Sequence, residues 1–152
     1  MFADVLKHMQ VVELDASELD QPISITSKGA VATVRDLIAD TAPASVRSMF
    51  GAADVAGDHV QPVSKLDPAA LRIVATETLR KSDPKHRVAA IGFGSYTPQE
   101  LIKEVESGTL MGARIVDAVR LSGLLVEQAI ASGKVRPRKN IYDKLHVPDF
   151  EF

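Results

Sequence analysis

The 152-residue sequence contains no cysteine. This absence excludes a disulfide framework, a thiolate nucleophile and any zinc site built on cysteine, and it is compatible with a reducing compartment. The first residues include an acid, Asp4, and lack the apolar core of a signal peptide. We therefore expect a cytoplasmic protein of bacterial type.

Long hydrophobic runs and an excess of one charge are also absent. No stretch approaches the roughly 18 to 20 consecutive apolar residues that a membrane helix needs, so we expect no membrane association. The chain has 18 basic and 20 acidic side chains, for a formal net charge of -2. No overall field draws it onto nucleic acid or an anionic lipid surface, and such binding would need a local basic patch.

Catalytic motifs are missing too. There is no Gly-x-Ser-x-Gly elbow, and Ser27-Lys28-Gly29 lacks the glycine frame of a phosphate-binding loop. The histidines are too far apart to share one helix face as metal ligands: His8, His59, His86 and His146. The sequence thus predicts no catalytic, cofactor-binding or metal-ligating residues and favours a protein that is not an enzyme.

One glycine pair deserves comparison with a nucleotide site. The apolar run 88–93 leads into Gly92-x-Gly94, as in a strand followed by a dinucleotide-binding turn. The third glycine of that fingerprint is replaced by Thr97, and further helix follows where a second strand is needed. We interpret the pair as a structural turn, and keep an enzyme acting on a phosphorylated small molecule there as a third hypothesis.

Helix boundaries are the clearest signals present. Asp67 followed by Pro68 is typical of a helix N-terminus. Thr97-Pro98-Gln99-Glu100 is a capping box, and Gly108 suits the left-handed residue that ends a helix. These signals predict one helix from 68, a second over 97–108 and a long third helix over 109–132.

The remaining pattern completes a helix-dominated α+β domain. Alternation and apolar spacing predict these elements: a helix then a strand in 2–14, a loop at 15–21, strands at 22–27 and 88–93, and helices at 30–42 and 45–55. A small sheet would combine residues 23–26 with 88–93. A mainly α fold is the alternative. We expect one globular domain over 1–133 and a C-terminal tail over 134–152.

The long helix is apolar beyond a single face. Its expected inward stripe is Met111, Ile115, Ala118, Val119, Ser122, Leu125, Val126 and Ala129, and Leu121, Leu124 and Ile130 widen it. A helix apolar most of the way round is either the centre of a fold or half of a subunit interface.

The tail is basic and then apolar. Its basic residues are Lys134, Arg136, Arg138 and Lys139, and its large apolar residues are Ile141, Tyr142, Leu145, Val147, Phe150 and Phe152. Each large apolar side chain gains about 1.5 to 3 kcal/mol on burial, so the tail should dock. Its own domain, a neighbouring subunit and a groove on another protein are the three alternatives.

These features favour a non-enzymatic interaction or assembly module whose partner is a second copy or another protein. The interaction residues would be Leu121, Leu124, Leu125, Tyr142, Leu145, Phe150 and Phe152. The alternative is a small DNA-binding regulator that uses the helical hairpin 97–132 with the basic segment 134–139. A recognition helix should carry basic residues near its start. The second helix of this hairpin has only Arg114 there, so it is a weak candidate.

Overall fold

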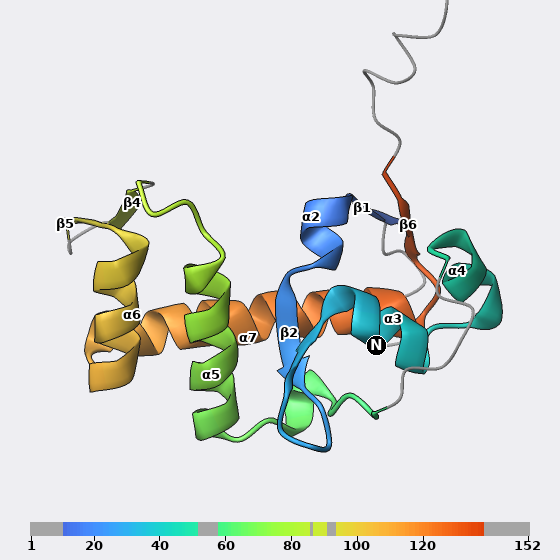
Figure 1. Ribbon diagram of the computed structural model, residues 1–152, viewed down its shortest axis with the longest axis horizontal. Coiled ribbons are helices and arrows are strands. Elements are labelled where there is room, and N and C mark those ends of the chain that lie inside the picture. Colours follow the sequence, from blue (N-terminus) through green and yellow to red (C-terminus); the bar gives the residue numbers. More distant parts are fainter. Residues whose placement is uncertain (1–10, 52–57, 86, 91–93, 139–152) are drawn as a thin grey trace, which may run out of the picture.

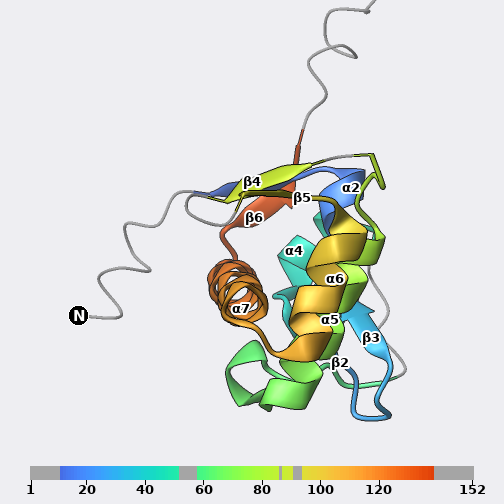
Figure 2. The same ribbon diagram turned by 90° about the vertical axis from the view of Figure 1, so that its left-hand side faces the viewer.

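The computed structural model describes residues 11–51, 58–85, 87–90 and 94–138. Its longest element is helix α7 (Leu110–Ala131), and the other described helices lie on one side of it (Figures 1 and 2). Helices α5 (Pro68–Arg80) and α6 (Pro98–Ser107) lie near its N-terminal end, and α3 (Val34–Thr41) and α4 (Ala44–Met49) near its C-terminal end. The fold is the helix-dominated α+β domain that the sequence predicts.

The N-terminal part corrects one expectation. Strand β1 (Val12–Leu14) leads into a short helix, α2 (Ala16–Leu19), where the sequence suggested a loop. Asp15 accepts a hydrogen bond from the Glu18 amide at 2.8 Å, and the Glu18 carboxylate accepts one from the Asp15 amide at 3.2 Å. This Asp-x-x-Glu capping box satisfies two amides that would otherwise lack partners, which stabilises a single helical turn.

A strand and a shorter helix replace the helix expected over 30–42, and the strand completes a β-hairpin with the one predicted at 22–27. Strands β2 (Pro22–Ile25) and β3 (Val31–Thr33) are antiparallel, and Gly29 between them has φ +88°. Helix α3 (Val34–Thr41) starts only at its N-cap Thr33, which exchanges hydrogen bonds with Asp36. The β-branched residues Val31 and Thr33 suit the strand, and the cap fixes where the helix begins.

The predicted boundaries of three helices are confirmed, and one of them is α7, which has Thr109 as its N-cap and Ser132 as its C-cap. Helix α5 (Pro68–Arg80) has Asp67 as its N-cap, and α6 (Pro98–Ser107) begins at the capping box of Thr97 and Glu100. Gly108 ends α6 in the left-handed conformation, with φ 67° and ψ 30°. The shorter helices α4 (Ala44–Met49) and η1 (Val63–Lys65) complete the helical part.

The sheet content is divided among three two-stranded pairs. Strand β1 is parallel to β6 (Val135–Pro137), β2 pairs with β3, and β4 (Val88–Ala90) pairs with β5 (Gly94–Tyr96). The expected sheet joining 23–26 to 88–93 is therefore wrong, because each of these strands pairs with its neighbour in sequence. A short hairpin has a smaller loop-closure cost than a distant pairing.

The core has two parts along α7. The main cluster includes Ile23, Leu37, Ile38, Val46, Val63, Ala129, Ile130 and Val135, and the second contains Ile25, Leu66, Leu71 and Val74. Half-buried Val116 and Val119 of α7 pack against the second cluster. The expected inward stripe of α7 is only partly right: Met111 and Ala129 are buried, but Ala118, Ser122 and Leu125 are exposed.

Two glycines bring α7 close to its neighbours. A Cβ at Gly112 would lie 2.1 Å from the backbone oxygen of Glu104 in α6, whereas one at Gly123 would lie 3.3 Å from the Val63 side chain. The first contact is with rigid backbone and the second with a side chain that is able to adjust. Gly112 is therefore required for the α6–α7 packing.

We expect Gly112→Ala to destabilise the protein by roughly 1 to 3 kcal/mol, because the overpacking outweighs the better helix propensity of alanine. Gly123→Ala is the matched control. It makes the same change in the same helix and should be close to neutral, since propensity offsets the mild crowding. Urea unfolding of both variants measures the difference, and an equal effect at both positions would contradict this account of the α6–α7 contact.

Candidate interaction surface

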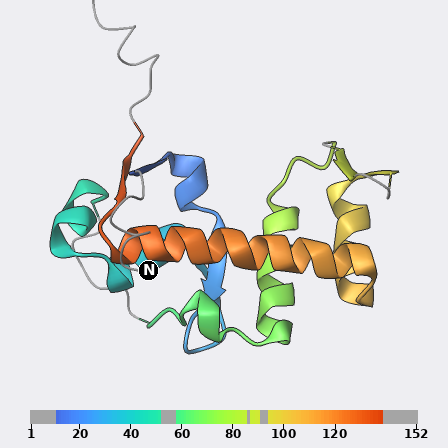
Figure 3. The same ribbon diagram turned by 180° about the vertical axis from the view of Figure 1, so that it is seen from behind.

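The outer face of α7 is apolar at its centre. Leu121 and Leu125 are 50% and 62% exposed, and the neighbouring Ala118 is exposed as well. Seen from behind, α7 lies in front of the other described helices along most of its length (Figure 3). Within the described chain, this face is the longest helical surface that no element covers.

The outer residues follow a three-and-four spacing. We define the outer seam of α7 as Arg114, Ala118, Leu121, Leu125, Gln128 and Ser132. Successive members are four, three, four, three and four residues apart, so they form one continuous stripe along the helix. The stripe is apolar in the middle and polar at both ends. Such a pattern is typical of a helix that packs against another helix.

Of the seven predicted interaction residues, the structure places two in this seam, Leu121 and Leu125. Leu124 is half-buried and packs against the main core cluster, so it lies at the edge of the exposed face. The other four lie outside the described residues: Tyr142, Leu145, Phe150 and Phe152. Ala118 was assigned to the inward stripe from the sequence. The burial of Ile130, on the opposite side of the helix, shows which face points outward.

The start of the basic segment is bound to the body. The guanidinium of Arg136 pairs with the Glu13 carboxylate at 3.2 Å, and that of Arg138 pairs with Glu18 at 3.2 Å and Asp15 at 3.5 Å. The backbone of this segment is also hydrogen-bonded to the body, because the Arg138 amide donates to the Leu14 carbonyl at 2.9 Å. These arginines therefore neutralise carboxylates of β1 and α2.

A groove lies on the flank of α7, between it and the elements α2, β2 and α5. Its volume is about 390 Å³. The lining is mainly apolar and comprises Leu14, Glu18, Gln21, Pro22, Ile23, Val34, Thr78, Ala118, Val119, Ser122, Gly123 and Val126. Ala118 belongs to both the groove and the outer seam, so the two surfaces adjoin.

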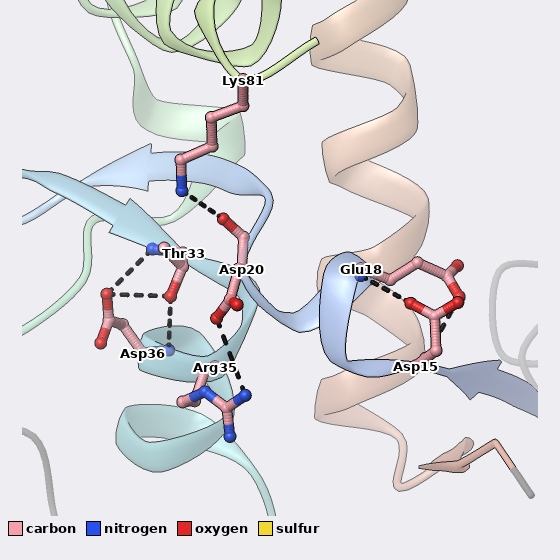
Figure 4. Close-up of polar contacts among 7 residues, drawn as sticks. All are labelled: Asp15, Glu18, Asp20, Thr33, Arg35, Asp36 and Lys81. Carbon is pink, nitrogen blue, oxygen red and sulfur yellow. Dashed lines mark hydrogen bonds and ion pairs between the residues drawn. The ribbon is translucent and has the colours of Figure 1, made fainter. Parts of the chain in front are cut away.

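Polar contacts near this groove connect its walls. The Lys81 ammonium at the end of α5 donates to the Asp20 carbonyl at 2.6 Å, and the Asp20 carboxylate lies 3.7 Å from the Arg35 guanidinium (Figure 4). They join the end of α5 and the start of α3 to the turn after α2. The groove is therefore built on linked elements.

Two capping carboxylates have lowered pKa values. The hydrogen bond from the Glu18 amide lowers the pKa of Asp15 below its ordinary 3.8, and the Arg138 charge contributes in the same direction. The amide and hydroxyl of Thr97 likewise lower the pKa of Glu100 below its ordinary 4.5. In both cases the structure favours the charged carboxylate.

One of the four histidines, His59, and one glycine of the pair, Gly94, lie within the described chain. His59 pairs with Asp40 at 3.0 Å, and no group of three or more histidine, aspartate or glutamate side chains there is arranged to hold a metal ion. His8, His86 and His146 lie outside the described residues, as does Gly92. Gly94 begins strand β5, so the chain crosses from strand to strand before α6.

The lowered pKa values predict an acid-sensitive stability. A folded-state pKa below the unfolded value adds stability that is present at neutral pH and is lost as pH falls through the folded pKa. We expect the free energy of unfolding to decrease below about pH 5. The double variant Asp15→Asn, Glu100→Gln should show a shallower decrease, because neither side chain titrates. Chemical unfolding across this range measures it, and an unchanged slope in the variant would contradict the assignment.

Comparisons with known proteins add no second line of argument. Scans of protein-family models, of curated proteins and of solved structures find no match to this chain. Among the described helices, none combines the length and the apolar character required to cross a membrane. The features of the described chain that bear on function are therefore the exposed seam, the adjoining groove and the ion pairs of β6.

Proposed function

We propose that this protein is a non-enzymatic assembly module that forms a two-fold dimer through the outer seam of α7. The observation that carries the proposal is the exposure of Leu121 and Leu125 at the centre of that seam. Exposed apolar residues are common singly, but a continuous stripe with polar ends is typical of an interface. The absence of cysteine is compatible with assembly in the cytoplasm, which we propose as its location.

The seam is complementary to itself when two copies of α7 run antiparallel. In that register Leu121 of one copy packs against Leu125 of the other, so four leucines form the centre. Ala118 then meets Gln128, and Arg114 meets Ser132 at the C-terminal end of the opposite helix. The terminal carbonyls of a helix favour a nearby cation, so Arg114 suits this position. A two-fold dimer uses the same surface on both copies, as this seam allows.

The apolar side chains that the seam can bury set the strength of the dimer. Helix α7 has 22 residues and is about 33 Å long at 1.5 Å per residue. Burying the exposed half of four leucines contributes roughly 3 to 6 kcal/mol, on the scale of 1.5 to 3 kcal/mol for each fully buried side chain. Association costs about 4 kcal/mol or more in lost motion. We therefore expect a weak dimer that dissociates on dilution.

The alternative of DNA binding has less support. Arg136 and Arg138, the arginines of its basic segment, already pair with carboxylates of the same chain. At the start of α7, where a recognition helix needs exposed polar side chains, Met111 and Gly112 are buried. No described feature favours this second function over self-association.

We expect the double variant Leu121→Asp, Leu125→Asp to be monomeric at concentrations where the natural chain dimerises, because four carboxylates would then face one another. Ile73→Asp is the matched control, since Ile73 is 48% exposed but lies on α5. Its mass should stay that of the dimer. Sedimentation velocity over a concentration series measures both. A natural chain that remains monomeric throughout would contradict the proposal.

The register is testable by cross-linking, since the chain has no cysteine of its own. We expect Leu121→Cys mixed with Leu125→Cys to form a disulfide-linked dimer of the two variants under mild oxidation. Each variant alone should cross-link poorly, because a disulfide needs Cα atoms within about 7 Å. Efficient self-cross-linking of Leu121→Cys would instead indicate parallel helices. Non-reducing gel electrophoresis separates these outcomes.

A further inference from the structure

The groove beside α7 has the properties of a peptide site. Eight of its lining residues are apolar or glycine, and they come from β1, β2, α3 and α7: Leu14, Pro22, Ile23, Val34, Ala118, Val119, Gly123 and Val126. Its volume of about 390 Å³ lies within the range of sites that enclose small ligands. It has room for a few side chains rather than for a folded partner.

The described chain ends at the rim of this groove. Arg138 donates its amide hydrogen to Leu14 and pairs with Glu18, and both of these residues line the groove. Arg138, the last residue that the structure describes, therefore lies beside the lining. Three residues further on, the sequence brings Ile141 and Tyr142, and Leu145 follows. An extended chain spans about 3.3 to 3.6 Å per residue, so Ile141 reaches roughly 10 Å from Arg138.

We propose that Ile141, Tyr142 and Leu145 dock into the groove of the same chain. The short tether favours this occupant over the tail of a second copy, because a linker of a few residues gives an effective concentration in the millimolar range. The apolar side chains match the lining, and the ion pairs of Arg138 fix the starting point. This inference does not rest on the proposed dimer, because Leu121 and Leu125 form the centre of the dimer and neither lines the groove; the two surfaces share Ala118 alone.

The first experiment uses tryptophan fluorescence in the full chain, which has no natural tryptophan. We expect Tyr142→Trp to emit at shorter wavelength and to be quenched severalfold less by acrylamide than free tryptophan. Ser122→Arg, placed in the exposed part of the groove lining, should restore strong quenching. Ser107→Arg makes the same change at an exposed site on α6 and should leave the tryptophan protected.

Each other outcome overturns the proposal. A tryptophan that is fully quenched in the otherwise natural chain shows that the segment does not dock. Protection that survives Ser122→Arg places the segment elsewhere, and protection that disappears on dilution shows docking onto a second copy. Leu145→Trp repeats the test if Tyr142→Trp does not fold.

Truncation supplies an independent measurement. A chain ending at Arg138 should melt at a lower temperature than the full chain, because the groove loses its apolar contacts. A synthetic peptide of residues 139–152 should raise the melting temperature again and shift the amide resonances of Ser122 and Gly123. The same peptide with Asp at 141, 142 and 145 should do neither. Equal melting temperatures and unshifted resonances would overturn the inference.

Discussion

The structure depends on the packing of other elements against one side of the long helix α7. Helix α7 lies against the backbone of α6 at Gly112, and at Gly123 it lies against the side chains of Val63 in η1 and Ile23 in β2. Close approach at these two points leaves the opposite side of the helix without a covering element in the described chain. The exposed seam is a consequence of this arrangement, because the two core clusters lie on the supported side.

The second organising feature is the attachment of β6 to β1 and α2. Val135 is buried in the main cluster, and the arginines on either side of Pro137 pair with Glu13, Asp15 and Glu18. Asp15 and Glu18 also form the capping box of α2, so these two side chains serve both a helix end and an ion-pair network. One edge of the flank groove is thereby fixed by residues from both ends of the described chain.

The sequence predicts those features that depend on a few neighbouring residues, chiefly the ends of helices. Asp67, Thr97, Gly108 and Thr109 set helix ends within a few residues, and their boundaries were predicted correctly. The capping boxes of Asp15 and Thr33 have the same chemistry but stand beside short elements, where periodicity gives no support. Strand partners depend on contacts distant in sequence, and the pairing of β1 with β6 had no sequence signal. For the candidate surface, apolar residues all round α7 indicated an interface, but only packing decided that Leu125 faces outward while Ile130 is buried.

The parallel pairing of β1 with β6 has a consequence for synthesis. Glu13 and Arg136 are 123 residues apart, so the first strand has no partner until almost all of the described chain has been made. During translation from the N-terminus, the carboxylates of β1 and α2 would remain solvated while the helices of the middle form. Closure of the domain then depends on synthesis of the last described residues, which makes the pairing of β1 with β6 a late step in folding.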